Sequence, residues 1–416
     1  MPHAPPLGAL LRQYAAGSAL ACDPVDQGLL NRGYRLRTTR GRYFLKHHFD
    51  PETAAPEAIA RQHRATQRLA ALGVPVAPPF PARDGRTVAV VGGHAYALHP
   101  WIEGRHRHGS QLTAAQCGRL GALLGVVHAS LERVMPLQER AGTEQGARAD
   151  GGARGAASAP ETPPHPLHPL HPQHPQHPQH PQGGRTAPAL CRAPARAGGA
   201  HAEKPSAGHP AAEASDPDAG PVDAGPVDAG ADPATTFALI DDLLARVRRH
   251  RPADSFDELA RHRLLERRAL LEQHVGRRPP HSGPVGWVHG DFHPFNLLYR
   301  GDAPAAIVDW DRLGVKPRAE EAVRAAAIFF VRPAGTLDLP KVRAYARAYR
   351  RTAGATPSEL AAAVHRVWWE RLNDFWMLRW HYERGDTRAD PQFPAASALV
   401  VWWTREYDAV CDAFAD

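Results

Sequence analysis

The alternation of apolar and polar positions in the first hundred residues predicts a small antiparallel sheet. Between its two pairs of strands, the apolar spacing of residues 56–72 is helical, and Gly73 follows where that helix should end. Four strands of alternating character are expected, at residues 29–37, 41–47, 87–91 and 94–104.

From residue 116 onward the apolar positions repeat every three to four residues, which predicts a mainly helical second half. Helices are expected at residues 116–131, 236–249, 256–274, 318–331, 341–351, 358–383 and 395–414. A sheet followed by a larger set of helices indicates an α+β fold with two lobes. Six of the nine tryptophans lie in the last two helices, at Trp368, Trp369, Trp376, Trp380, Trp402 and Trp403.

Tryptophans at helical spacing favour burial against neighbouring helices. The alternative is that they line a pocket that binds a small-molecule substrate. In that case Glu370 and Asp374, which lie four residues apart, would meet a cationic substrate unless Arg366 or Arg371 neutralises them.

The composition changes sharply over residues 136–235, which are rich in Pro, Gly, Ala, Asp and His. Such a segment buries too little apolar surface to offset its ordering entropy, so we predict a disordered insert. Its His-Pro-x repeat (165–182) has the period of a polyproline II helix, with imidazoles about 9 Å apart, too far for one zinc ion. The sequence identifies no partner for the insert. The predicted organisation is an N-terminal nucleotide-binding lobe (1–101), the start of the second lobe (102–135), the insert (136–235) and a catalytic and substrate-binding lobe (236–416).

One loop carries the strongest candidate chemistry. Asp291 and Asn296 lie five residues apart, and Asp309 follows a short apolar run downstream. Phosphoryl transfer from a nucleotide needs an acid that orients the attacking hydroxyl, and it needs oxygen ligands for magnesium. We therefore interpret Asp291 as the base, and Asn296 and Asp309 as the metal ligands.

The string H-G-D-x-x-x-x-N at residues 289–296, followed by I-V-D-W-D at 307–311, resembles the aminoglycoside phosphotransferase family. That family groups antibiotic, choline and homoserine kinases with a protein-kinase-like fold. The resemblance implies ATP and Mg²⁺ as cofactors, the same roles for the three residues above, and His289 as a support for the loop. The alternative, a chance loop with two acids, leaves the upstream pattern unexplained.

The N-terminal strands and helix carry the expected nucleotide contacts. Lys46 ends the second strand, where its ammonium would reach the phosphates, and the resemblance places Asn31 and Gly33 near the turn that covers them. On the helix, Gln62 occupies the position where a glutamate should pair with this lysine. A neutral amide supplies no counter-charge, so the pairing of Lys46 with the helix departs from the family pattern.

The connector at residues 98–102 would be the hinge that recognises adenine, with Leu98 and Trp101 at the site. The alternative is an ordinary strand end capped by Trp101. Two further residues are expected to have structural roles. His128 should be an internal residue whose ring nitrogens are hydrogen-bonded, and Glu321 should support the active-site loops. Asp311 would assist at the metal or bond a loop backbone.

Several features separate this chain from protein kinases and from other classes. His293 stands where protein kinases place a lysine, and neither a G-x-G-x-x-G turn nor a later A-P-E sequence is present. The net charge of +7 comes with no nucleic-acid motif, so we expect no nucleic-acid partner. Four cysteines without paired spacing, no signal peptide and no membrane-length apolar run predict a cytoplasmic protein without a membrane partner.

The expected function is transfer of the γ-phosphate of ATP to a hydroxyl of a small molecule, so the expected partners are a nucleotide and that acceptor. Aminoglycosides, amino alcohols, sugars and nucleosides all fit the catalytic half of the sequence, and GTP fits as well as ATP. A catalytically weak or inactive nucleotide-binding scaffold is the alternative, because Gln62 lacks the expected charge and the insert would suit a tether.

Overall fold

The computed structural model describes residues 4–25, 31–49, 55–135, 230–280 and 283–416. The predicted insert, except for its last six residues, lies outside these ranges, so its disorder remains a prediction. Helix α4 begins at Pro233, three residues before the expected start of that helix at residue 236.

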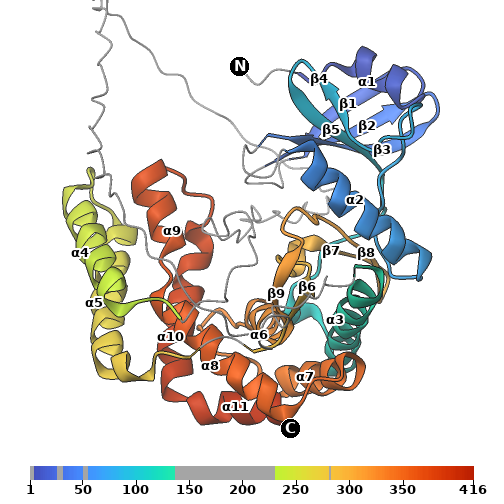
Figure 1. Cartoon of the computed structure of the whole chain (residues 1–416). Coiled ribbons are helices and arrows are strands. Elements are labelled where there is room, and N and C mark those ends of the chain that lie inside the picture. Colours follow the sequence, from blue (N-terminus) through green and yellow to red (C-terminus); the bar gives the residue numbers. More distant parts are fainter. Residues whose placement is uncertain (1–3, 26–30, 50–54, 136–229, 281–282) are drawn as a thin grey trace, which may run out of the picture. The chain divides into compact units, whose positions relative to one another are not determined.

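The N-terminal part is a five-stranded antiparallel sheet with the strand order β1-β2-β3-β5-β4 (Figure 1). Its strands are β1 (Ala19–Val25), β2 (Arg32–Thr38), β3 (Gly41–His48), β4 (Ala89–Val91) and β5 (His94–Pro100), accompanied by helices α1 (Leu7–Gln13) and α2 (Pro56–Ala71). Alternate residues such as Leu36, Leu45 and Leu98 form its apolar core. The four predicted strands and the helix are confirmed, whereas α1 and β1 were not expected.

The remaining described part is mainly helical and contains the larger core. Its long helices are α3 (Ala114–Val134), α4 (Pro233–Arg249), α5 (Ser255–His274), α6 (Arg318–Phe329), α7 (Leu339–Ala353), α8 (Pro357–Asn373), α10 (Phe393–Arg405) and α11 (Tyr407–Ala415). Helix α3 packs along α7, and α8 packs against α6 and α11. These contacts connect segments on both sides of the insert into one core.

Two helices predicted as continuous are broken. Residues 358–383 form α8, the short α9 (Trp376–Arg379) and a π-helical turn (Trp380–Arg384). The break occurs at Asp374, whose backbone is extended and whose side chain accepts a hydrogen bond from the Trp376 amide at 3.0 Å. The predicted helix 395–414 is also divided, into α10 and α11, at Glu406, which makes no side-chain cap.

The tryptophans belong to the core, as favoured by their spacing. Trp368, Trp369, Trp380 and Trp403 are at most 1% exposed, and Trp376 is nearly as deeply buried. Burial of side chains this large contributes strongly to the stability of the helical part.

Two short two-stranded sheets lie between α5 and α6 in the chain. Strand β6 (Val285–Val288) pairs with β9 (Gly314–Pro317), and β7 (Leu297–Arg300) pairs with β8 (Ala303–Ile307). The loops between these strands contain Asp291, Asn296 and Asp309. The two sheets thus bring the two halves of the candidate motif together.

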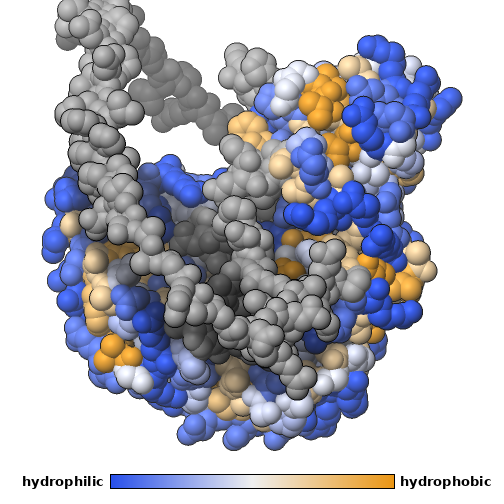
Figure 2. Space-filling view, viewed as in Figure 1, coloured by the Kyte–Doolittle hydropathy of each residue, from blue (hydrophilic) through white to orange (hydrophobic). Residues whose placement is uncertain are grey.

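Hydrophilic residues cover most of the described surface in view in Figure 2, and apolar residues form small separate patches. Exposed large apolar side chains such as Leu20, Phe49 and Val90 are scattered, which is normal on protein surfaces. Within the described ranges, none of the helices has both the length and the apolar character that crossing a membrane requires.

Candidate active site

A cavity of about 540 Å³ brings most of the predicted site residues together. It is lined by Lys46 from β3, by Asp291 and Asn296 from the loop after β6, and by Asp309 from the loop after β8. Asn31, Gly33, Gln62 and Trp101 also line it.

Asp291 lies in a loop whose backbone is held by buried polar groups. His289 is fully buried; its Nε2 donates to the Val308 carbonyl at 3.0 Å, and its Nδ1 accepts from the Asp291 amide at 3.2 Å. Burial lowers the pKa of His289, so the ring stays neutral and suits a structural role. It touches the backbone of both loops, as expected of a support.

Gly290 is required by the path of the same loop. Its φ of +87° lies in the left-handed region, and a Cβ there would be only 2.0 Å from the Arg312 carbonyl oxygen. The close approach of these two backbones is what sets Asp291 beside the Asp309 loop.

Asn296 is fixed by its amide nitrogen, which donates to the Asp291 carbonyl at 2.9 Å and contacts the Asp291 carboxylate at 3.3 Å. The same nitrogen lies 3.2 Å from Nε2 of His293. The side-chain carbonyl oxygen is thus the atom that remains for a metal ion. Asn296 also links the two loops, because its backbone carbonyl accepts from the Val308 amide at 2.9 Å.

Asp309 has a positive φ of +57°, which is uncommon for any residue other than glycine. Such strain is often retained where a side chain must point into a functional site. Its carboxylate accepts a hydrogen bond from the Lys46 ammonium at 2.6 Å. An aspartate oxygen and an amide oxygen form a hard donor set that fits Mg²⁺.

Lys46 is paired with two carboxylates, Asp309 and Asp311, each at 2.6 Å. Burial alone would lower the pKa of Lys46, but attraction first to Asp309 and then to Asp311 outweighs it and raises the pKa. The ammonium therefore stays charged inside the cavity. The carboxylates beside Lys46 come from the loop after β8, whereas α2 presents the neutral Gln62 to this cavity.

Gln62 contributes to this arrangement indirectly. Its amide nitrogen donates to the Asp311 backbone carbonyl at 2.8 Å, while Asn31 donates to the Asp311 carboxylate. Asp311 is thus held from both sides of the cavity. Sequence reasoning missed this role, and the only signal was the two-residue spacing of Asp309 and Asp311.

Glu321 has the structural role that the sequence suggested. It is buried, and its carboxylate accepts hydrogen bonds from the backbone amides of His289 and Gly290. It also contacts Nε2 of His128 at 2.7 Å, and the other nitrogen of that ring lies 3.0 Å from the Tyr349 hydroxyl. Helices α3, α6 and α7 therefore fix the position of the catalytic loop.

The expected hinge residues differ in their surroundings. Trp101 lines the cavity, whereas Leu98 is buried in the N-terminal core and does not line it. The Leu98 carbonyl already accepts from the Phe80 amide at 2.7 Å. Adenine recognition in this segment remains a prediction.

Four further histidines line the cavity and were not identified from the sequence: His48, His63, His99 and His106. Burial lowers the pKa of His63 to about 2 and that of His99 to about 4, so both rings are neutral. The pKa of His48 is also lowered by burial. Strand alternation places His48 on the same face as Lys46, which was the one available signal.

The acids suggested for a cationic acceptor are not equivalent. Glu370 is held by a bidentate pair with Arg324, at 2.6 and 2.9 Å, whereas Asp374 caps the Trp376 amide. Both line a second cavity of about 300 Å³, together with Trp369. Neutralisation of Glu370 weakens its case as a receptor for a cation.

Comparison with known proteins gives consistent results. A model of the phosphotransferase enzyme family, APH, matches residues 21–355. A homoserine kinase of Acidiphilium cryptum is 30% identical over 143 residues, covering 34% of this chain and 43% of the relative. A homoserine kinase of Bartonella tribocorum is 28% identical over 131 residues, covering 30% and 38%. The chain thus spans about two fifths of the length of these curated relatives.

Solved structures show a similar fold. Spectinomycin phosphotransferase APH(9)-Ia, in complex with ADP and spectinomycin, gives a TM-score of 0.53 at 10% identity and covers 96% of this chain and 97% of its own. The microcompartment-associated aminopropanol kinase gives 0.50 at 15% identity, covering 98% and 99%. At these identities the likeness concerns the fold, and it confirms the predicted α+β architecture.

Proposed function

Because the chain belongs to the phosphotransferase enzyme family, we propose that it transfers the γ-phosphoryl group of ATP to a hydroxyl group of a small molecule. The observation that carries this proposal is the convergence of Lys46, Asp291, Asn296 and Asp309 in one cavity. These residues come from separate segments, and phosphoryl transfer requires this combination of groups.

Asp291 is the proposed base. It positions the acceptor hydroxyl and takes its proton as the oxygen attacks the γ-phosphorus, while the bond to the bridging oxygen breaks and ADP leaves. His289 and Glu321 act through the loop backbone and hold Asp291 in place. Positioning of this kind supplies much of the acceleration in phosphoryl transfer.

Asn296 and Asp309 are the proposed ligands of Mg²⁺, which would neutralise charge on the phosphates when bound. The donor set fits this ion, because the amide oxygen of Asn296 remains available and Asp309 offers a carboxylate at the cavity. Lys46 adds a fixed positive charge for the phosphates. Asp311 is its proposed counter-ion, in place of a helix glutamate.

The pairing of Lys46 also bears on the alternative function, an inactive nucleotide-binding scaffold. The neutral Gln62 was the main reason for that alternative, but Lys46 has two acidic partners from elsewhere in the fold. The complete set of charged groups favours an active enzyme.

The acceptor class follows from the relatives only as a proposal. Their name, homoserine kinase, makes a small amino acid with a primary hydroxyl the first compound to test. Amino alcohols and aminoglycosides come next.

The test is magnesium-dependent ADP release from ATP with a panel of these acceptors, run with the wild type, Asp291→Asn and a surface control, Asp242→Asn. Asp242 pairs with Arg246 on the exposed face of α4. Turnover with one acceptor class that is lost only in Asp291→Asn supports the proposal. ADP release that is the same in all three proteins contradicts it.

A further inference from the structure

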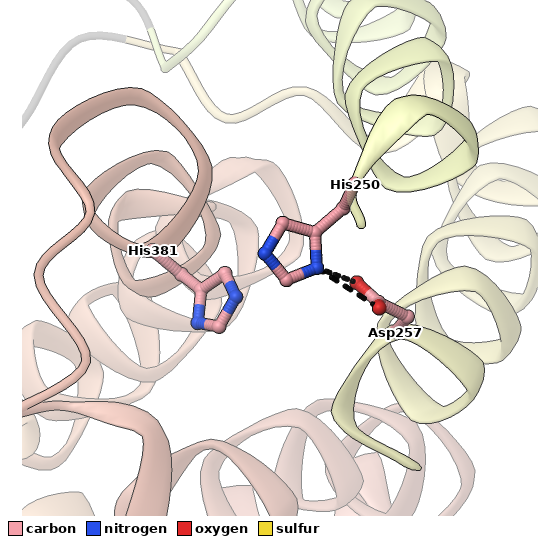
Figure 3. Close-up of side chains that lie close together, drawn as sticks. All are labelled: His250, Asp257 and His381. Atoms are coloured by element: carbon pink, nitrogen blue, oxygen red, sulfur yellow. Dashed lines mark hydrogen bonds and ion pairs between the residues drawn. The ribbon is translucent and has the colours of Figure 1, made fainter. Parts of the chain in front are cut away.

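Three side chains with metal-binding atoms converge at a place that the proposed reaction does not use. His250 caps the C-terminus of α4, Asp257 lies in the first turn of α5, and His381 lies in the π-helical turn after α9 (Figure 3). One ligand atom from each residue lies within 4.8 Å of the other two. None of the three lines the cavity around Lys46.

The His381 ring is oriented as in many metal sites. Its Nδ1 lies 2.8 Å from the Asp390 carboxylate, which places the proton on Nδ1 and the lone pair on Nε2. Metal-bound histidines commonly donate their other N–H group to a carboxylate in this way. In Figure 3 one ring nitrogen of His381 faces the side where His250 and Asp257 meet.

The Asp257 carboxylate is also held in a fixed position. It accepts hydrogen bonds from the Tyr382 hydroxyl at 2.7 Å and from the Asp254 amide at 2.9 Å, and it is 5% exposed. Its oxygens lie 3.0 and 3.1 Å from Nδ1 of His250. A carboxylate offers about four lone-pair sites, and the two that face His250 become available for a metal bond when Nδ1 of His250 itself binds the ion.

The distances are close to those of a zinc site. With bonds of about 2.1 Å, two ligand atoms of a tetrahedral zinc ion are about 3.4 Å apart. The contact between His250 and Asp257 would therefore open by only a few tenths of an ångström. The third atom, on His381, has to approach by about 1.4 Å at most, which a side-chain rotation provides.

Two independent features support binding of a cation here. The π-helical turn that carries His381 is a rare conformation, and such turns are frequent at functional sites. In addition, Oδ1 of Asp390 is buried and has no hydrogen-bond partner among the described residues. Burial of a carboxylate oxygen without a partner is costly, and a cation bound to His381, which pairs with the other oxygen of Asp390, would reduce that cost.

We propose that His250, Asp257 and His381 bind a divalent transition-metal ion, with zinc as the principal candidate and water completing its coordination. Two imidazoles and one carboxylate suit zinc, whereas Mg²⁺ prefers oxygen ligands only. The ion joins the end of α4, the start of α5 and the turn after α9. It therefore stabilises this part of the helical region independently of the phosphoryl-transfer site.

The test measures zinc binding of the full chain in competition with a chromophoric chelator, together with thermal unfolding with and without zinc. The variants are His381→Gln, which retains a donor for Asp390, and Asp257→Asn. The matched control is His262→Ala, because His262 is an exposed histidine on the same helix as Asp257. The six histidines of the His-Pro-x repeat are present in every variant, so their contribution cancels in the comparison.

We expect the wild type and His262→Ala to bind one more tight equivalent of zinc than His381→Gln or Asp257→Asn. Zinc should raise the unfolding temperature of the first two proteins only. Asp390→Asn keeps all three ligands and should weaken binding by about 10- to 100-fold. This variant keeps the proposal testable even if the variants of the three ligands fold poorly. Equal stoichiometry and affinity in the wild type and Asp390→Asn, or in the control and His381→Gln, would overturn the proposal.

Discussion

Replacing Asp311 with asparagine tests whether this carboxylate is the counter-ion that positions Lys46. The two groups are 2.6 Å apart, and their side chains are only 13% and 10% exposed. The change keeps the size of the side chain and an acceptor oxygen while removing the charge. Lys46 retains Asp309 in the free protein, but in the proposed complex that carboxylate binds magnesium.

The magnitude follows from the contact that is lost. A hydrogen bond to a charged group contributes about 1.5–3 kcal/mol. Because each 1.4 kcal/mol is a factor of ten, the affinity for MgATP should fall by about 10- to 100-fold. Global stability should change less, since Asp309 still neutralises the ammonium.

Calorimetric titration with MgATP measures this change without knowledge of the acceptor. The double variant Asp311→Asn/Gln62→Glu should recover part of the affinity, because Gln62 lines the same cavity as Lys46 and a glutamate there restores a carboxylate. The recovery is partial, because a carboxylate cannot donate the hydrogen bond that the Gln62 amide gives to the Asp311 carbonyl. The surface variant Asp242→Asn is the control. A change of less than threefold in Asp311→Asn would refute the assignment of Asp311.

Three further predictions concern stability, each measured by urea or thermal unfolding. Glu321→Gln should cost about 3 kcal/mol near neutral pH, because buried backbone amides lose a charged acceptor. Burial would raise the pKa of Glu321, but the hydrogen bond with the His128 imidazole outweighs burial and lowers the folded-state pKa. The stabilising contribution of the carboxylate is therefore complete above about pH 4.3 and is lost as pH falls through the folded-state pKa. The loss of stability in Glu321→Gln should accordingly become smaller in acid. Gly290→Ala should cost several kcal/mol, whereas Gly301→Ala, with a similar φ but open space, should cost about 1 kcal/mol. Trp403→Ala should cost about 3–5 kcal/mol, and the partly exposed Trp402 clearly less. Equal effects within either matched pair, or a deficit for Glu321→Gln that does not depend on pH, would contradict these arguments.

Most of the secondary structure and the candidate catalytic loop could be located from the sequence because both depend on local patterns. The strands around Lys46 alternate regularly, and the loop containing Asp291 and Asn296 has a characteristic spacing. The break at Asp374 was missed because tryptophans continue the helical spacing across it. A single side-chain cap on the Trp376 amide overrides that pattern.

Contacts between distant segments could not be predicted in the same way. Lys46 and Asp311 are separated by 265 positions, and nothing local to either residue indicates the pair. The cluster of His250, Asp257 and His381 likewise depends on the packing of α4, α5 and the turn after α9. Single histidines and aspartates in helical segments carry no signal until the fold brings them together.

The central claim is that Asp291 performs the transfer while Asp309 holds the metal that accompanies the nucleotide. Its most direct test compares MgATP binding with turnover, using the acceptor that the panel identifies, in Asp291→Asn and Asp309→Asn. We predict that Asp291→Asn binds MgATP like the wild type but loses turnover by at least about 100-fold, as expected for a general base. Asp309→Asn should lose magnesium-dependent binding itself. Turnover of Asp291→Asn at the wild-type rate would contradict the account.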